Sequence, residues 1–413
     1  MRIGLIHYSG PPIVGGVEQT LYYHAKVLAD NGYRPQLLVG EGQSFDPRVP
    51  VTVIPTLYSK HPEVLAIKAV LDSGQTDDRF DRLRHSLRER LGEAIVEVDF
   101  LIVHNALTLH KNLALTAALW DLVQTGLSVP IIGWHHDFAW DRSQYRAELH
   151  DGFPWQLLRQ PWPGVVNVVV SDAQRDRLAD LYNASPESIH VIPPGIDLAV
   201  SGNWTDVTKK LVAELGLLQA DAILLLPARI TRRKNIEFAM RILAELRDLS
   251  RQDIRLVVTG PPGPHNPANA AYLQSLLSLR ATLGLEPAAH FLYQLDVADR
   301  LVLDEHTMAN LYTLSDALLF PSHEEGFGIP LLEAVYARLP IFCSDIAPFH
   351  ESAGEQAHYF SLSDTPHQVA QAIAETLLAE PSLLLRRRVR SRYTWTNIVG
   401  QKLLPLLERG YVG

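Results

Sequence analysis

A glycine-rich loop in the second half of the chain carries two carboxylates eight residues apart, Glu325 and Glu333. The loop follows the apolar run 317–320, and Pro330 stands where the first turn of a helix tolerates proline. A loop that leads from a strand into a helix presents free backbone amides, which suit the oxygens of a diphosphate. Carboxylates accept hydrogen bonds from ribose or hexose hydroxyls. The segment predicts a site for a phosphorylated sugar compound, with helix capping as the plain structural alternative for both carboxylates.

A cluster of four cations follows the apolar run 222–226, with Arg229, Arg232, Arg233 and Lys234 inside six residues. The chain as a whole is acidic, with a formal net charge of -9, so this local concentration of positive charge is distinctive. Guanidinium and ammonium groups both bind phosphate oxygens. From the residues alone this cluster is either a phosphate site or a solvated loop, and we interpret Arg232 and Arg233 as part of a solvated loop.

A third segment, Gly15-Gly16, lies between the first apolar run and the first predicted helix. Paired glycines let the backbone approach a ligand closely. The segment does not match the glycine spacing of a dinucleotide-binding loop, and no acidic residue ends a plausible second strand. A plain tight turn is an equally good interpretation of these glycines.

A fourth segment, His135-His136-Asp137, ends another apolar run in the first half. Side chains of successive residues point apart, and no further ligands occur at useful spacing, so we do not expect a metal site here. His136 beside Asp137 suits hydrogen bonding to a sugar hydroxyl or proton handling. His104 ends the preceding predicted strand, and we expect it either to line the same wall or to serve a structural role.

Short apolar runs alternate with amphipathic stretches in both halves, which is the pattern of parallel sheets covered by helices. Helices are predicted over 18–30 and 77–97. The segments 41–80 and 138–162 show no clear pattern that we can interpret. The predicted strands are 3–7, 34–39, 100–103, 130–134 and 165–170 in the first half, and 222–226, 254–259, 290–293, 317–320, 340–343 and 357–360 in the second.

The length of 413 residues suits two domains, and the proline-rich segment 191–197 marks the boundary between them. We predict two α/β, Rossmann-like domains, 1–197 and 198–395, facing across a cleft between the carboxyl ends of their sheets. Residues 396–413 are predicted to form a further amphipathic helix.

The composition excludes several classes of protein. The negative net charge argues against binding of duplex nucleic acid. The single cysteine, Cys343, permits no intramolecular disulfide and reads as a core thiol. The N-terminus reads as a strand rather than a signal peptide, and no apolar run is long enough to span a membrane. We therefore expect a cytoplasmic enzyme without a transmembrane segment.

Taken in order, these segments resemble the retaining GT-B glycosyltransferases of family 4 (the group 1 glycosyltransferases), from Met1 to about Trp395. The most specific match is the Glu-x7-Glu pattern from Glu325 to Glu333. The other matches are Gly-Gly-Val-Glu at 15–18, His-Asp at 136–137, Pro-Gly-Ile-Asp at 194–197, Arg229 with Lys234-Asn235, and Gly260 after a strand.

The resemblance implies a hexosyltransferase that uses a nucleotide-diphosphate sugar, of the GDP-mannose or UDP-glucose type, and needs no metal or other cofactor. Arg229 and Lys234 would neutralise the donor diphosphate, which elsewhere is a task for a metal. Glu333 would hold the ribose. Glu325 would hold the transferred sugar, helped by the amides of Phe327, Gly328 and Ile329. The absence of any Asp-x-Asp sequence fits metal-independent chemistry.

For the first domain, the resemblance implies that His136 bonds the sugar and takes part in catalysis with Glu325, Arg229 and Lys234. Gly16 would lie against the donor, as would Gly260 in the second domain. Gly15, His104 and Asp137 would face the acceptor. The C-terminal helix would return to the first domain, and the sugar would keep its anomeric configuration through a front-face route.

Two departures and two alternatives qualify the resemblance. Gln294 stands where the family often has glycine near the base, and the segment 260–267 is unusually rich in proline. A sugar-nucleotide 2-epimerase fits the Glu-x7-Glu pattern less well. A non-catalytic binding protein would be expected to lose charge at Glu325, Arg229 or Lys234, and all three are present. Because the first domain shows no basic amphipathic helix, we expect a small soluble sugar or glycoside acceptor rather than a lipid.

Overall fold

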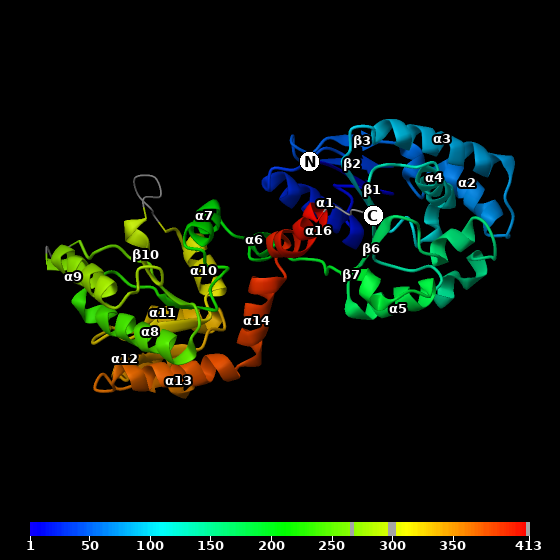
Figure 1. Ribbon diagram of the computed structural model, residues 1–413. Coiled ribbons are helices and arrows are strands. Elements are labelled where there is room, and N and C mark those ends of the chain that lie inside the picture. Colours follow the sequence, from blue (N-terminus) through cyan, green and yellow to red (C-terminus); the bar gives the residue numbers. More distant parts are fainter. Residues whose placement is uncertain (265–267, 296–302, 410–413) are drawn as a thin grey trace. The chain divides into compact units, whose positions relative to one another are not determined.

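The computed structural model describes residues 1–264, 268–295 and 303–409, and the chain divides into two compact units. The first unit is Met1–Gly195 with the C-terminal segment from Trp395, and the second is Ile196–Thr394 (Figure 1). The chain thus passes from the first unit to the second after residue 195 and returns to the first after residue 394. Gly195 packs so tightly on Trp395 that an added Cβ would lie 2.8 Å from its backbone nitrogen.

The first unit is built on a seven-stranded parallel sheet in the order β3-β2-β1-β4-β5-β6-β7. Its strands are β1 Arg2–His7, β2 Arg34–Val39, β3 Val51–Val53, β4 Phe100–His104, β5 Ile131–His135, β6 Val165–Val169 and β7 Ile189–Val191. The helices before the crossover are α1 Gly16–Asp30, α2 Pro62–Leu71, α3 Asp78–Ala94, α4 Leu113–Gln124 and α5 Asp172–Tyr182. The central strands are buried on both faces, which explains why they read as continuous apolar runs.

The C-terminal segment packs on this first sheet, where Trp395, Val399 and Leu403 join the core that contains Ile3 and Leu5. It forms α15 Trp395–Ile398, a π-helical turn Val399–Leu403 and α16 Leu404–Glu408, rather than the one helix predicted over 396–413. The physical reason is Pro405, which has no N–H to continue an α-helical ladder. The last four residues of that prediction lie outside the described residues.

The second unit is built on a six-stranded parallel sheet in the order β10-β9-β8-β11-β12-β13. Its strands are β8 Ala222–Leu226, β9 Ile254–Val258, β10 Ala289–Phe291, β11 Ala317–Phe320, β12 Ile341–Ser344 and β13 His358–Phe360. The helices are α6 Leu198–Ser201, α7 Asp206–Glu214, α8 Ile236–Ser250, α9 Ala268–Thr282, α10 Glu305–Leu314, α11 Ile329–Tyr336, α12 Ala347–Ala353, α13 Pro366–Ala379 and α14 Pro381–Arg392.

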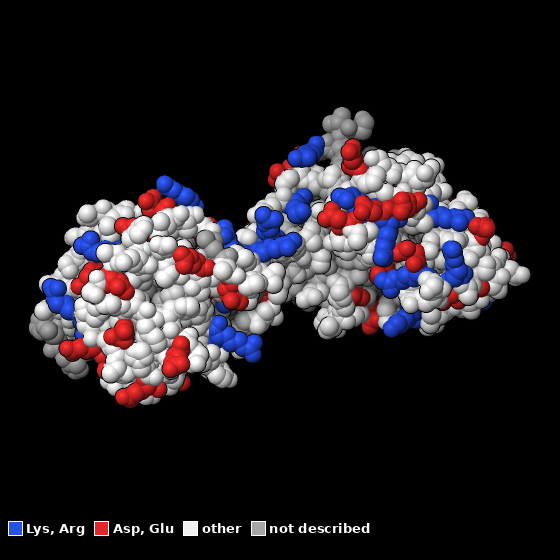
Figure 2. All heavy atoms as spheres, turned by 90° about the horizontal axis from the view of Figure 1, so that it is seen from below, with Lys and Arg blue, Asp and Glu red and all other residues white. Residues whose placement is uncertain are grey.

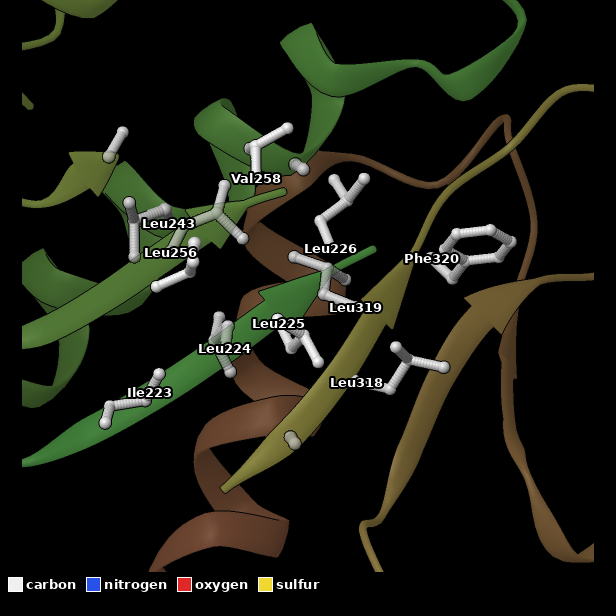
Figure 3. Packing of buried hydrophobic residues seen from close by; sticks show 14 of the residues in the cluster. Ile223, Leu224, Leu225, Leu226, Leu243, Leu256, Val258, Leu318, Leu319 and Phe320 are labelled. Carbon is white, nitrogen blue, oxygen red and sulfur yellow. The ribbon is translucent and has the colours of Figure 1, made fainter. Parts of the chain in front are cut away.

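The core of the second unit is formed by aliphatic side chains from β8, β9 and β11, with α8 packed against them. Figure 3 shows Leu224, Leu256 and Leu318 on the three neighbouring strands. A buried ion pair fixes the start of β11, because Asp316 Oδ2 lies 2.9 Å from Arg390 of α14 and accepts a 2.9 Å hydrogen bond from Ile223 N of β8. The register of β8 against β11 is therefore held at both the backbone and the side-chain level.

Both sheets reverse their direction of strand addition once. Counted within each unit, the order begins 3-2-1-4-5-6, so the reversal falls between β1 and β4 in the first unit and between β8 and β11 in the second. Ligands of open parallel sheets bind outside the carboxyl ends of the strands at such a reversal. The order points to the loops after β8 and β11 as the first place to look for a site.

The structure differs from the predicted elements in a few places. The strand predicted over 290–293 ends at Phe291, because Leu292–Gln294 form a 3₁₀ turn. The segments without a clear pattern hold the short edge strand β3, the helix α2, and 3₁₀ turns at Ser143–Glu148 and Trp155–Arg159. Within the described part of the chain, no helix has the length and apolar character needed to cross a membrane.

Candidate functional site

The two segments of the second unit that the sequence singled out lie against each other. β8 and β11 are paired neighbours, so the loops that follow them leave the same edge of the sheet. His323 N, in the loop after β11, donates a 2.8 Å hydrogen bond to Arg233 O, in the loop after β8. The cationic cluster and the carboxylate loop therefore form one site at the strand-order reversal.

Lys234 and Glu325 form the centre of this site. The Lys234 ammonium donates a hydrogen bond to Glu325 Oε1 and lies 4.5 Å from the centre of the Phe320 ring. Each of the two side chains is only 9% exposed. Burial lowers the pKa of Lys234, and the bond to Glu325 opposes that shift. A buried ammonium of this kind gains from a second anion, so the pair is suited to receive phosphate oxygens.

Arg233 also belongs to this site, contrary to the interpretation of Arg233 as part of a solvated loop. Its guanidinium is about half exposed, yet Nη1 lies 3.0 Å from Glu325 Oε2 and 3.2 Å from Glu324 O. Arg232 lies over the ring of Tyr272 instead, with 5.1 Å between guanidinium carbon and ring centre. The sequence offers no signal that separates two adjacent arginines. The 3₁₀ turn Arg232–Lys234 decides which of them reaches the carboxylate.

The backbone of the carboxylate loop leaves a set of donors without partners. Among the described residues, the N–H groups of Gly326, Phe327, Gly328 and Ile329 make no hydrogen bond. Gly328 caps α11 with a φ of 103°, and a Cβ there would lie 2.9 Å from the Phe349 ring. Free amides at the start of a helix form an anion site, because the helix dipole adds positive charge at the same place.

Glu333 lies in α11, with its side chain on the exposed surface of the unit. Its Oε2 accepts a 2.5 Å hydrogen bond from the hydroxyl of Tyr312 in α10. Burial, and then the bond to Glu333, raise the pKa of Tyr312, so this hydroxyl stays protonated and donates. Within the described part of the chain Glu333 Oε1 has no partner, which leaves one carboxylate oxygen for a ligand.

Arg229 is exposed and its guanidinium has no partner among the described residues. The backbone next to Arg229 packs on the segment that follows β9. Ile230 N donates a hydrogen bond to Pro261 O at 2.9 Å, and an added Cβ at Gly260 would lie 2.5 Å from Ala228 O. The expected contact of Gly260 with the donor stays a prediction. Its glycine character has a packing cause, since it supports the turn that carries Arg229.

In the first unit, Asn105 shapes the turn that carries His136. Asn105 adopts a φ of 63°, and its Oδ1 accepts hydrogen bonds from His136 N at 3.0 Å and Asp137 N at 3.1 Å. Burial lowers the pKa of His136 to about 3, with a further contribution from the charge of His7. The imidazole is therefore neutral, and its Nε2 has no partner in the described part of the chain.

The other residues expected near His136 are placed differently from one another. His104 is completely buried, and its ring stacks on that of His136 at 5.8 Å, so it supports His136 from behind and lines no exposed wall. The Asp137 carboxylate pairs with Arg142 rather than with the adjacent histidine. The complete burial of His104 argues against its expected place at an acceptor, whereas the acceptor role of Asp137 stays a prediction.

The glycine pair lies at the start of α1. An added Cβ at Gly16 would meet nothing within 4 Å, so this backbone is open, whereas one at Gly15 would overlap the carboxylate of Glu18. Glu18 accepts a 2.5 Å hydrogen bond from Ser9 Oγ and lies 3.9 Å from His7 Nε2. Glu18 thus holds the glycine loop against the end of β1, a role that the sequence pattern alone did not reveal.

Figure 2 shows acidic and basic side chains spread over both units on the face in view. Among the residues that the structure describes, no three metal-ligating side chains come together as a possible metal site.

Comparison with known proteins assigns the family. A model described as Glycosyltransferase Family 4 matches residues 14–200, and one described as Glycosyl transferases group 1 matches residues 207–393. The chain belongs to the group 1 glycosyltransferases. It is accordingly a transferase that uses a nucleotide-sugar donor, and its two parallel-sheet units have the α/β architecture predicted from the sequence.

Two of the relatives match this glycosyltransferase over most of its length, and a third matches about half of it. Mannosylglucosylglycerate synthase of Petrotoga mobilis is 26% identical over 398 residues, covering 87% of this chain and 88% of that protein. The MMP alpha-(1->4)-mannosyltransferase of Mycolicibacterium hassiacum is 24% identical, covering 97% of this chain and 96% of its own. A D-inositol 3-phosphate glycosyltransferase of Kineococcus radiotolerans is 29% identical over 52% of this chain and 49% of its own.

Solved structures of similar proteins include the sucrose-phosphate synthase of Thermosynechococcus elongatus, with 17% identity and a TM-score of 0.40, covering 99% of this chain and 100% of that one. The Anabaena protein HepE in complex with UDP-glucose has 18% identity and a TM-score of 0.36, with the same coverage.

Proposed function

We propose that this glycosyltransferase moves a hexose from a donor of the GDP-mannose or UDP-glucose type to a hydroxyl of a small sugar or glycoside, with retention and without a metal. The observation that carries the proposal is the cradle at the β8–β11 reversal, which joins the buried ammonium of Lys234 to the free amides of residues 326–329. Cation and amides converge on one edge of the sheet, where a diphosphate gains from both.

The diphosphate is bound by this cradle, with Arg229 as a second cation. As the sugar departs, negative charge grows on the leaving diphosphate, and fixed donors aimed at that charge stabilise the transition state. Lys234, Arg229 and the N-terminus of α11 supply such donors without a metal ion. The chain contains no Asp-x-Asp sequence to hold one.

The two carboxylates divide the rest of the donor between them. Glu333 keeps one oxygen free while Tyr312 holds the other, which suits a ribose hydroxyl. Glu325 lies beside the free amides and accepts hydrogen bonds from hydroxyls of the transferred hexose. The N–H groups of Phe327, Gly328 and Ile329 donate hydrogen bonds to the same sugar. This division predicts that Glu325 governs the sugar and Glu333 the nucleoside.

Retention follows a front-face route in this proposal. Arg233 lies on Oε2 of Glu325 and Lys234 on Oε1 before the donor binds, and a carboxylate that stays paired with a cation is a poor nucleophile. The acceptor oxygen instead attacks the anomeric carbon on the side from which the diphosphate leaves. The carbon–oxygen bond to the diphosphate breaks, the new glycosidic bond forms, and the acceptor proton passes to a diphosphate oxygen.

The first unit supplies the acceptor side. The neutral imidazole of His136 bonds a sugar hydroxyl, and the open backbone at Gly16 approaches the ligand. Two relatives that match nearly the whole chain are named for mannosyl transfer or a mannosyl product, and one of these products is a glycoside of glycerate. These names favour GDP-mannose as the first donor to test, with a small anionic glycoside as the first acceptor, in a cytoplasmic setting.

The proposal is tested by a thermal-shift panel of GDP, UDP, ADP and their common sugar conjugates, with and without EDTA. Specific binding raises the unfolding midpoint by mass action. A shift that one diphosphate produces and EDTA leaves unchanged supports the proposal and names the base. A shift that EDTA removes contradicts metal independence, and the absence of any shift contradicts the donor site.

A further inference from the structure

Arg233 holds the carboxylate loop at several points. Its Nη1 donates to Glu325 Oε2 at 3.0 Å and to Glu324 O at 3.2 Å, and its carbonyl accepts the hydrogen bond from His323 N at 2.8 Å. One residue thus touches three consecutive residues of the loop that presents the free amides. A guanidinium suits this task because its planar fork makes two directed bonds at once.

Glu325 has a separate cation on each oxygen, and the two cations differ in their surroundings. Lys234, on Oε1, is 9% exposed, and Arg233, on Oε2, is 52% exposed. Lys234 lies deep in the cradle, where a donor diphosphate competes for it. A carboxylate that is only 9% exposed is costly to leave without a counter-ion.

We infer that Arg233 is a positioning residue that keeps Glu325 paired with a cation and directed at the transferred sugar while the Lys234 ammonium binds the donor diphosphate. The inference rests on the proposed function and gives Arg233 and Lys234 separate roles, which the sequence did not suggest. Lys234 exchanges one anion for another, and Arg233 stays with Glu325 throughout. Arg233 itself binds no part of the donor.

Arg232 provides a matched control, because it carries the same side chain one residue earlier. Its guanidinium lies over the Tyr272 ring and makes no contact with the carboxylate loop within the described part of the chain. The variants Arg233→Gln and Arg232→Gln therefore remove equal charge from the same turn. Only the first of them removes the bonds to Glu324 and Glu325.

The test measures calorimetric affinity for UDP, GDP, UDP-glucose and GDP-mannose, together with the slow hydrolysis of both sugar nucleotides by water. For Arg233→Gln we expect affinity for the preferred bare diphosphate to change by less than about twofold. Affinity for its sugar conjugate should fall by about fivefold or more, and kcat for hydrolysis by about tenfold, as the loss of one charge-assisted bond predicts. Arg233→Lys should recover part of the lost kcat, and Arg232→Gln should match the wild type.

Two results would overturn the inference alone. If Arg233→Gln weakened binding of the bare diphosphate as much as Lys234→Gln does, Arg233 would be a phosphate ligand. If Arg233→Gln and Arg232→Gln behaved alike, its bonds to the loop would have no functional role. A wild-type protein that bound none of the four ligands would contradict the proposed function and, with it, this inference.

Discussion

The hydroxyl of Tyr312 lies 2.5 Å from Oε2 of Glu333, so α10 supports a carboxylate that α11 presents at the surface. The two helices flank β11, one before it and one after it in the chain. The bond fixes the rotamer of an otherwise exposed side chain and leaves its second oxygen for a ligand. Removal of the Tyr312 hydroxyl should therefore weaken binding of the nucleoside.

Tyr312→Phe is expected to weaken binding of the ribonucleoside diphosphate by about tenfold, because a hydrogen bond to a charged group is worth about 1.5 kcal/mol or more. Affinity for the matching 2′-deoxy or 3′-deoxy nucleotide should change less, since the ribose hydroxyl is already missing. Tyr336→Phe is the control, because Tyr336 is exposed at the end of α11, the helix that carries Glu333. Equal losses for the ribo- and deoxynucleotides would argue against a ribose role for Glu333.

Glu325→Ala is expected to abolish sugar transfer while leaving affinity for the bare diphosphate at the wild-type value or above it. The change removes the carboxylate that occupies Lys234 before the donor arrives, so the ammonium becomes free for phosphate. Lys234→Ala and Arg229→Ala should each weaken diphosphate binding by tenfold or more, at about 1.5 kcal/mol or above per charge-assisted bond. Titration calorimetry with GDP and UDP distinguishes the variants. Unchanged turnover in all three would refute the site assignment.

Gly328→Ala is expected to lower the free energy of unfolding of the second unit by about 2 kcal/mol and to weaken diphosphate binding. Alanine is strained at a φ of 103°, and its Cβ would lie 2.9 Å from the Phe349 ring. Gly326→Ala is the control, because a Cβ there meets nothing within 4 Å. Urea unfolding compares the two, and equal stability would show that the turn at 328 tolerates a side chain.

The strands of the central sheets could be predicted because a parallel strand buried on both faces is a continuous apolar run. The runs Ala222–Leu226 and Ala317–Phe320 match the observed strands residue for residue. The edge strand Val51–Val53 is short and partly exposed, so it leaves no comparable run. A helix can be interrupted where a backbone N–H is missing, as at Pro405. The periodicity of apolar residues does not predict such an interruption, because it reports burial and not hydrogen bonding.

The members of the site could be predicted more readily than their partners. Lys234 and Glu325 stand out as a cation and a carboxylate after strands, but their pairing depends on β8 and β11 being neighbours in the sheet. His136 and Asp137 are adjacent in sequence, yet the carboxylate pairs with Arg142. The family resemblance supplied the roles, and the pairing required the three-dimensional structure.

The first unit contains buried imidazoles that make its stability depend on pH. Burial lowers the pKa of His24 to about 3 and that of His135 to about 4, and each side chain has no exposed surface. Both are neutral in the folded protein, whereas in the unfolded chain they bind protons below their ordinary value of about 6.5. Because the unfolded state then holds more protons, the free energy of unfolding falls as pH falls from about 6.5 towards 4.

Each fully buried histidine is expected to contribute a slope of up to about 1.4 kcal/mol per pH unit over that window. Urea unfolding at pH 7.5, 6.0 and 5.0, followed by tryptophan fluorescence, measures the loss, since Trp134 lies 4.4 Å from His24 between ring centres. His24→Gln should lower the free energy of unfolding at pH 7.5. It should also reduce the slope of that free energy against pH by the contribution of one histidine. A slope that is the same in wild type and variant would mean that His24 is protonated in the folded protein, against its complete burial.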